Sequence, residues 1–288
     1  MATIFRYTLR RFRGQILGWG LALSLLVLLI VGIYDSIAAD MREQIEELFA
    51  SYPAELMAFF GVGDMTSGMF SPEGFLSLEF FSWMPVVLGI FAVLMGSGLL
   101  ASDEEQGRLD LIMAHPVSRS ALFMGRLLAF VTATVGILAI LWLAFLVSMN
   151  WSATLSIGAA ELGGPFLSLL AVLLLFSTLA LLLSMVLPSR RLAASVAGLL
   201  LVASFFVTSL ARINEDLETI AKFSPLNYYQ TEEAFGHFNV QWFAGLLAVA
   251  AVFSALAWWR FQRRDIRVGG EAGWKLPSLS LPFRRVAR

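Results

Sequence analysis

The chain has 288 residues, of which 58% are hydrophobic and only 14% are charged. Together with a mean hydropathy of +0.78, this composition excludes an ordinary soluble domain, in which about a quarter of the residues are charged. The formal net charge of -1 gives no reason to expect nucleic acid as a partner. The absence of cysteine excludes disulfides, thiol nucleophiles and thiolate metal sites.

The first segment in chain order, residues 2–13, is basic and amphipathic. One face of a helix here would carry three arginines, namely Arg6, Arg10 and Arg13. Another face would carry Phe5, Leu9 and Phe12. This pattern predicts a helix lying in the membrane interface, and it is equally compatible with a basic flank that only sets topology. The apolar run that follows is too long for a signal-peptide core, so we expect a retained first span.

Six apolar runs are each long enough to cross about 30 Å of hydrocarbon as a helix. They cover residues 16–33, 83–101, 127–149, 165–187, 192–210 and 240–259. Only Pro188 to Arg191 separate the fourth run from the fifth, which predicts a tight helical hairpin. We therefore predict an all-α polytopic membrane protein with six transmembrane helices, forming a single transmembrane domain over residues 1–288.

Basic residues assign the orientation of these spans. An even number of spans puts both chain ends on one side, and that side then holds 17 of the 20 lysines and arginines. The other side keeps only Arg42, Arg212 and Lys222, together with 15 of the 21 acidic residues. Because basic residues accumulate in cytoplasmic loops, we expect both termini in the cytoplasm, as well as a basic tail over residues 261–288.

Two longer segments fall on the predicted outer side. Residues 35–82 are expected to begin with a helical stretch at 39–60 and to continue as a glycine-rich loop at 61–74. Residues 212–239 are too polar to span, are rich in aromatic side chains and are broken by Pro225. They predict short helices that re-enter the outer leaflet, and the alternative is a surface loop carrying an interfacial aromatic belt.

The predicted span cores contain no Asp, Glu, Lys, Arg or His. Proton-coupled carriers and voltage sensors keep ionisable side chains inside the membrane, so an ion-coupled carrier is disfavoured. The intramembrane hydroxyls, from Ser24 to Ser209, are expected to serve packing, and any one of them could alternatively line a substrate path. There is no phosphate-binding G-x-x-x-x-G-K-[ST] motif, no set of metal ligands and no nucleophile–base pair. We expect no catalytic residue, no metal and no cofactor on this chain.

The polar stretch 102–126, between the second and third spans, is the most unusual segment. Three acids, Asp103, Glu104 and Glu105, open it, and Gly107 precedes a helix-like run at 108–114 that Pro116 ends. Ser118 is placed to cap the next helix. An ordinary charged loop is one interpretation. The mixed charge and the apolar residues favour a short amphipathic helix on which a soluble partner docks.

This stretch resembles a motif of the type 2 exporter permeases of ATP-binding cassette (ABC) transporters, whose membrane subunits have six helices and the type V fold. The family pattern is E-E-x-G-T-L-E-L-L-L-A-x-P-V-S-R, followed by a lysine. This chain reads EEQGRLDLIMAHPVSR from Glu104 to Arg119, and Arg126 stands where the lysine usually falls. Arg108 and Asp110 replace a threonine and a glutamate. Ser224-Pro225-Leu226-Asn227-Tyr228 is similar to the family pattern before the last span.

The resemblance implies roles for three groups of residues. It implies an ATPase-coupling helix with its flanks, comprising Glu104, Glu105, Gly107, Arg108, Leu109, Asp110, Pro116 and Arg119. It implies an interfacial helix carrying Arg6, Arg10 and Arg13. It also implies an outer re-entrant segment with Ser224, Pro225, Asn227 and Tyr228.

The resemblance also implies partners and a location. Two separate ABC ATPase subunits would bind ATP and Mg²⁺, and a second copy or a similar permease would complete a dimer in the plasma membrane, which is the inner membrane in bacteria. Export of a hydrophobic or amphipathic substrate is the expected function, and an anchor or scaffold for an ATPase is the alternative. We expect that reversing Glu104 and Glu105 to lysine uncouples transport while the protein stays folded.

Overall fold

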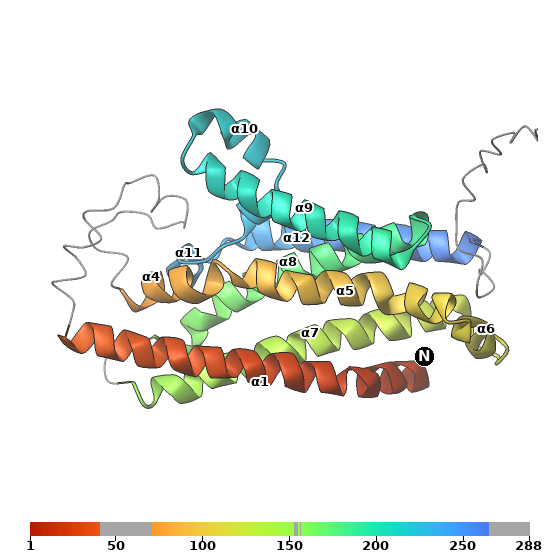
Figure 1. Cartoon of the computed structure of the whole chain (residues 1–288), viewed down its shortest axis with the longest axis horizontal. Coiled ribbons are helices and arrows are strands. Elements are labelled where there is room, and N and C mark those ends of the chain that lie inside the picture. The colour runs from red at the N-terminus through yellow and green to blue at the C-terminus, as the bar shows by residue number, and fades with distance from the viewer. Residues whose placement is uncertain (41–70, 153–154, 156, 265–288) are drawn as a thin grey trace, which may run out of the picture.

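A computed structural model describes residues 1–40, 71–152, 155 and 157–264, and these residues contain helices and connecting segments without any strand. The long helices lie side by side along the longest axis of the molecule (Figure 1). The predicted stretches 39–60 and 61–74 lie largely outside the described residues, as does nearly all of the predicted basic tail 261–288.

Six helical segments are long and apolar enough to cross a membrane. They are α1 (Ala2–Asp40), the succession of α4 (Pro72–Leu76), η1 (Ser77–Phe81) and α5 (Met84–Glu105), α7 (Arg119–Met149), α8 (Ala159–Val186), α9 (Arg190–Ala211) and α12 (Val240–Arg263). Each contains one predicted span almost completely. The all-helical fold with six spanning helices is therefore confirmed.

Short helices mark the two ends of the bundle. The first end carries α6 (Arg108–Met113), between α5 and α7, and we call it the α6 end. The opposite end carries η2 (Glu215–Leu217), α10 (Glu218–Ala221), η3 (Pro225–Tyr228) and α11 (Glu233–Gly236), and we call it the α10 end. Figure 1 shows the N-terminus at the α6 end.

Helices α5 and α8 form the centre of the bundle. They pack on each other and are the most buried of the spanning helices. Helix α1 packs along α7, α12 packs on α8, and α9 rests on both central helices. Because α8 is apolar around its whole circumference, it can bury side chains against several neighbours at once. The outer helices instead leave apolar faces exposed, as expected where lipid surrounds a protein.

The basic N-terminal segment differs from the prediction of a separate interfacial helix. Residues 2–13 continue without interruption into the first span, as parts of the single helix α1. The predicted faces are present, since Phe12 is buried while Arg6, Arg10 and Arg13 are exposed. No proline separates the segment from the span, so hydrogen bonding continues through both.

An aromatic cluster closes the core near the α10 end. The rings of Phe80 and Phe81, in the π-helical turn η1, contact Phe145 of α7, and Phe81 also contacts Phe166 of α8. The Tyr229 hydroxyl donates to the Phe81 carbonyl at 2.9 Å. The segment after α9 is thereby fastened to the second spanning segment.

Candidate coupling site

The turn between α5 and α6 is built on a glycine. Gly107 has φ of 65°, the only positive φ among the described residues, and an L-residue with a side chain adopts this conformation at a cost. The turn directs α6 away from α5, and the buried Leu109 anchors it to the bundle. Asp110 and Leu111 are exposed. Helix α6 therefore presents a short polar and apolar surface at the tip of the α6 end.

The start of α7 is capped as predicted. Helix α6 ends at Met113, shortly before Pro116, and the Ser118 hydroxyl accepts a hydrogen bond from the Ala121 amide at 3.2 Å. Helix α7 begins at Arg119, which adds two turns to the predicted third span. Arg126 lies inside this helix and is only 5% exposed.

A buried carboxylate gathers three arginines below α6. Asp103 is 4% exposed, near the end of α5. Its oxygens lie 2.6 Å from Arg126 Nη2, 2.8 Å from Arg108 Nη2 and 3.2 Å from Arg11 Nη1. Arg126 also donates to the Leu99 carbonyl at 2.8 Å. A buried charge is tolerated when it is paired and hydrogen-bonded, and this cluster joins α1, α5, α6 and α7.

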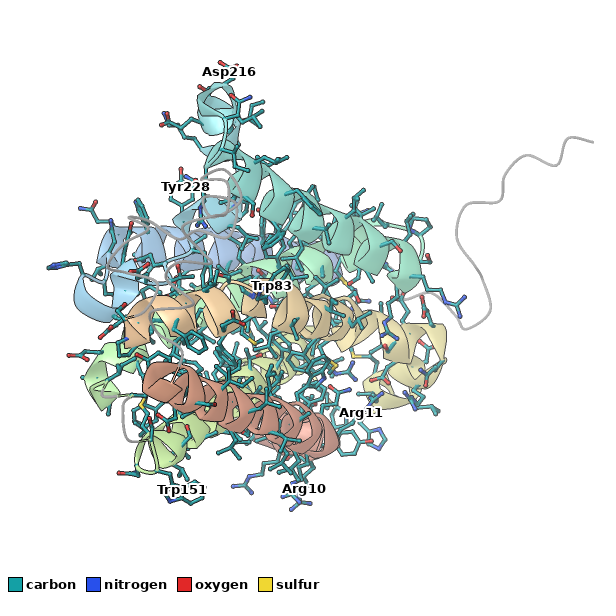
Figure 2. The ribbon with its side chains drawn as sticks, turned by 60° about the vertical axis from the view of Figure 1, so that its left-hand side comes forward. Arg10, Arg11, Trp83, Trp151, Asp216 and Tyr228 are labelled. Carbon is teal, nitrogen blue, oxygen red and sulfur yellow. The ribbon has the colours of Figure 1, made fainter. Side chains whose placement is uncertain are left out.

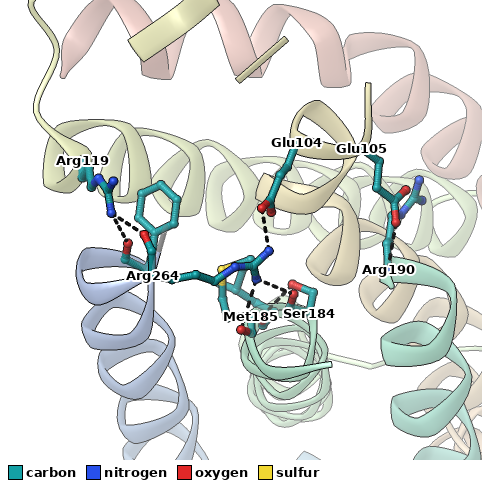
Figure 3. Close-up of polar contacts among 9 residues, drawn as sticks. Glu104, Glu105, Arg119, Ser184, Met185, Arg190 and Arg264 are labelled. Atoms are coloured by element: carbon teal, nitrogen blue, oxygen red, sulfur yellow. Dashed lines mark hydrogen bonds and ion pairs between the residues drawn. The ribbon is translucent and has the colours of Figure 1, made fainter. Parts of the chain in front are cut away.

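A second ion pair ties the end of α12 to α5. Arg264 Nη2 lies 2.6 Å from Glu104 Oε1, and Arg264 also donates to the Met185 carbonyl, near the end of α8, at 3.1 Å. Arg119 in turn donates to the carbonyls of Phe261, Gln262 and Arg264 at the end of α12. Guanidinium groups thus satisfy carbonyls that have no partner within their own helices, as Figure 3 shows.

Glu105 links α5 to α9. One of its carboxylate oxygens accepts the Arg190 backbone amide at 2.9 Å, at the first turn of α9, and Figure 3 shows the two residues facing each other. An acid at a helix N-terminus interacts favourably with the helix dipole. With this contact, all six spanning segments are connected at the α6 end through charged side chains.

The structure places the predicted coupling residues on three helices, α5, α6 and α7. Arg108, Leu109 and Asp110 lie on α6, after the turn at Gly107. Glu104 and Glu105, which the resemblance assigned to the coupling helix and its flanks, do not lie on α6 but form the last turn of α5. Arg119 starts α7 and caps α12, so its guanidinium faces the bundle. The predicted segment 102–126 is therefore two helix ends around a six-residue helix.

Sequence reasoning missed three members of this site. Arg11 was not separated from its exposed neighbours, Arg126 was treated only as a motif position, and Arg264 was assigned to the tail. Figure 2 shows Arg10 and Arg11 pointing in different directions from the same end of α1. A signal existed in the helical spacing, because Arg11 falls beside the buried Phe12 rather than on the predicted arginine face.

The predicted re-entrant residues lie at the α10 end. The Ser224 hydroxyl is buried within hydrogen-bond distance of the hydroxyls of Ser204 (2.5 Å) and Thr208 (2.7 Å) on α9. Pro225 starts η3, which also contains Asn227 and Tyr228, and the Tyr228 hydroxyl donates to the Lys222 carbonyl. Short helices thus lie on both sides of the break before Pro225, as predicted, and their re-entry into the outer leaflet stays a prediction. Figure 2 shows Asp216 at the outermost tip of this end.

A comparison with protein families gives a match over nearly the whole chain. The family model described as ABC-2 family transporter protein matches residues 3–266, which is nearly the whole chain. No curated protein matches the chain.

Proposed function

The chain belongs to the ABC-2 transporter family and is a membrane permease of an ABC transporter, and from this premise we propose that it moves a hydrophobic or amphipathic substrate out of the cell. Permeases of this family generally work with ABC ATPase partners. We infer that two such ATPase subunits bind at the α6 end, where they bind and hydrolyse ATP with Mg²⁺, and that two permease chains complete the transporter as a homodimer or heterodimer.

The observation that supports the proposal is how α6 is attached to the bundle and which of its side chains are exposed. Leu109 is 1% exposed, whereas Leu111, two residues later, is 69% exposed. Arg108 joins α6 to Asp103, so a displacement of α6 would act on the network that links the spanning helices. A short helix with an exposed apolar side chain can bind a soluble subunit. Because an ion pair joins this helix to the bundle, it can transmit a movement of that subunit to the spanning helices.

The proposed location is the plasma membrane. The proposed orientation places the α6 end in the cytoplasm. Among the described residues, the α10 end carries only Arg212 and Lys222 as basic residues. The basic residues of the interhelical turns and helix ends at the α6 end include Arg108, Arg190 and Arg263. This asymmetry is the one expected for a cytoplasmic α6 end.

The substrate class is supported by a cavity near the α10 end. It has a volume of about 680 Å³ and lies between α8, α9, η3 and α12. Its lining is largely apolar and aromatic, including Phe176, Phe223, Tyr228, Trp242 and Phe253. Small-molecule sites commonly have volumes of about 300–1,000 Å³ and mostly apolar walls. A hydrophobic or amphipathic molecule therefore fits this cavity better than a bare ion does.

The test is purification of the tagged chain from its native host in mild detergent, with mass spectrometry of the proteins that accompany it. We expect an ATPase with a phosphate-binding loop, in equal amount to the permease. Recovery of a folded permease dimer without any ATPase, under conditions in which a known ABC complex stays intact, would contradict the proposal. Once the ATPase is identified, stimulation of its activity by candidate substrates tests the substrate class.

A further inference from the structure

We infer that the groove between α1 and α5 at the α6 end is a binding site for an anionic phosphate group, of the kind that an acidic phospholipid carries. Neither the family match nor the proposed coupling role assigns such a site. The inference requires only that the chain is a membrane protein, so it can fail independently of the proposed function.

The groove exists because α1 packs along α7 rather than along α5. It has a volume of about 270 Å³ and extends from Leu94 to Gln106 on α5, which is about three helical turns. One turn closer to the bundle centre, the ring centroids of Trp19 and Phe91 lie 5.9 Å apart, and these two rings close the gap between the two helices. The cavity is therefore confined to the last turns before the α6 end, where a lipid headgroup would lie if the helices cross a membrane.

Polar and cationic side chains line this groove. They come from four helices and include Arg11, Gln15, Ser102, Gln106, Arg126 and Arg190. A ligand in this groove would therefore meet hydrogen-bond donors rather than hydrocarbon. The volume corresponds to several water molecules, since one water takes about 30 Å³ in the liquid. A phosphate group with part of its glycerol fits this space.

The charges around the groove do not balance. Among the described residues, four guanidinium groups, those of Arg11, Arg108, Arg126 and Arg190, face two nearby carboxylates, Asp103 and Glu105. The three arginines that pair with Asp103 saturate it, and Glu105 accepts the Arg190 backbone amide. An excess of two positive charges remains. Positive charge beside hydrocarbon is costly unless a counter-ion accompanies it.

Arg190 is the cation that points to a ligand. Its guanidinium lies along α5, where its only hydrogen bond among the described residues is a 3.5 Å contact with the Leu94 carbonyl. Gly98 makes this position possible, since a Cβ there would lie 3.0 Å from Arg190 Nε. The guanidinium thus reaches the groove without an ion-pair partner in the part of the chain that the structure describes. Arginine binds phosphate through paired N–H groups and is therefore the side chain expected at such a site.

The experiment measures binding of defined probes to the purified chain in neutral detergent by native mass spectrometry. The probes are short-chain phosphatidylglycerol, short-chain phosphatidylcholine as the zwitterionic control, and inorganic phosphate. We expect one tightly bound phosphatidylglycerol per chain, with at least tenfold weaker binding of phosphatidylcholine. Competition by millimolar inorganic phosphate would identify a soluble phosphate compound as the ligand, and its absence would identify the lipid headgroup. Both outcomes support the site.

Two variants and one control locate the binding. Arg190→Gln removes the unpaired cation and keeps the backbone contact with Glu105, and we expect about tenfold weaker binding, as for loss of one charge-assisted hydrogen bond. Arg191→Gln removes the same charge from the next, exposed residue and should leave the affinity unchanged. Gly98→Ala crowds the Ser102 hydroxyl (2.9 Å) and the Arg190 guanidinium (3.0 Å), which both line the groove, without changing any charge, and should also weaken binding.

The proposal is overturned if phosphatidylglycerol and phosphatidylcholine bind equally. It is also overturned if Arg190→Gln, with an unchanged melting temperature in the absence of lipid, binds phosphatidylglycerol as tightly as Arg191→Gln does. Unchanged binding in Gly98→Ala would contradict the placement of the site over α5.

Discussion

Asp103 has an unusual position, because one buried carboxylate holds guanidinium groups from three other elements. Its neighbour Arg126 is equally buried, so each charge is tolerated through the other. Arg11 and Arg108 contribute less to stability, because their side chains are 47% exposed and solvent screens their charges. The pair Asp103–Arg126 is therefore expected to supply most of the stability that the cluster contributes.

Replacing this carboxylate should destabilise the protein. Asp103→Asn keeps the shape and removes the charge, which leaves Arg126 buried without a counter-ion, and we expect a loss of roughly 3–5 kcal/mol. The measurement is the apparent melting temperature in mild detergent, compared with Asp110→Asn. Asp110 is exposed on α6, so its variant should melt within about 1 °C of the wild type. Equal melting of the two variants would show that the buried pair contributes nothing.

At the residue scale, chain position alone could not identify this pair. Asp103 was recognised as one of three consecutive acids, which gave no reason to separate it from Glu104 or Glu105. In the structure the three side chains point to different helices and bind Arg126, Arg264 and the Arg190 amide, respectively. Helical geometry rotates successive side chains by about 100°, but their partners are distant in sequence and therefore could not be predicted.

At the element scale, α6 combines a fixed inner side with a free outer side. Leu111→Ala should leave the fold intact, because an exposed side chain contributes little to stability. If the ATPase covers α6, the same change removes an apolar contact from an interface, and we expect about fivefold to tenfold weaker association with the ATPase. Binding of the purified ATPase to the permease measures this effect.

The matched control for this variant is Leu199→Ala on α9. Leu199 is also 69% exposed, but it lies in the middle of a spanning helix, where a soluble subunit cannot reach it. It should bind the ATPase as the wild type does. Wild-type association by Leu111→Ala, or an equal loss in both variants, would argue against α6 as the docking element.

The structure revises the expected effect of charge reversal at the end of α5. Glu104 is buried and paired with Arg264, 160 residues later, so Glu104→Lys should destabilise the bundle rather than only uncouple it. We expect a loss of several kcal/mol for Glu104→Lys or Arg264→Glu alone. The double variant should regain part of that stability, which a double-mutant cycle on apparent melting temperatures detects.

Reversal of an exposed pair is the control for this cycle. Glu218 starts α10 and Lys222 follows its last residue; the Lys222 Nζ lies 3.3 Å from the Glu218 Oε1, and both side chains are more than half exposed. Glu218→Lys should change stability by no more than about 0.5 kcal/mol. Simple addition of the two losses in the Glu104→Lys, Arg264→Glu double variant would mean that the two side chains do not interact.

The same contacts explain which element boundaries the sequence could predict. The six apolar cores were recognisable because a membrane requires about 20 apolar residues for each helix. Their ends were not, since α5, α7 and α12 each continue through charged residues that hydropathy assigns to water. In α5 and α7 such charges are paired across the bundle, as in the pair Asp103–Arg126, and hydropathy does not register pairing. The interfacial helix predicted over residues 2–13 is instead the beginning of α1, because an amphipathic segment can continue as the same helix into the span that follows it.

At the scale of the whole molecule, charge and packing divide the protein into two dissimilar ends. The α6 end is held together by ion pairs and by arginine contacts with helix carbonyls. The α10 end is held by aromatic packing and by hydroxyl and amide contacts, such as the Gln230 backbone N–H donating to the Ser168 hydroxyl at 2.8 Å. Movement of α6 would therefore act on the network of ion pairs at the α6 end. The apolar cavity lies at the other end, between α9 and α12. Transport in this arrangement requires the long helices to carry the displacement.

This arrangement predicts a definite topology, which the absence of cysteine makes easy to test. Ala114→Cys places a single thiol after α6, and Thr219→Cys places one on α10, and both positions are exposed. A membrane-impermeant maleimide should label Thr219→Cys in right-side-out vesicles and Ala114→Cys only in inside-out vesicles, because the proposed orientation places the basic α6 end in the cytoplasm. The cysteine-free wild type provides the background in both preparations. The opposite labelling pattern would place α6 outside the cell, away from any cytoplasmic ATPase, and would contradict the orientation and the coupling role together.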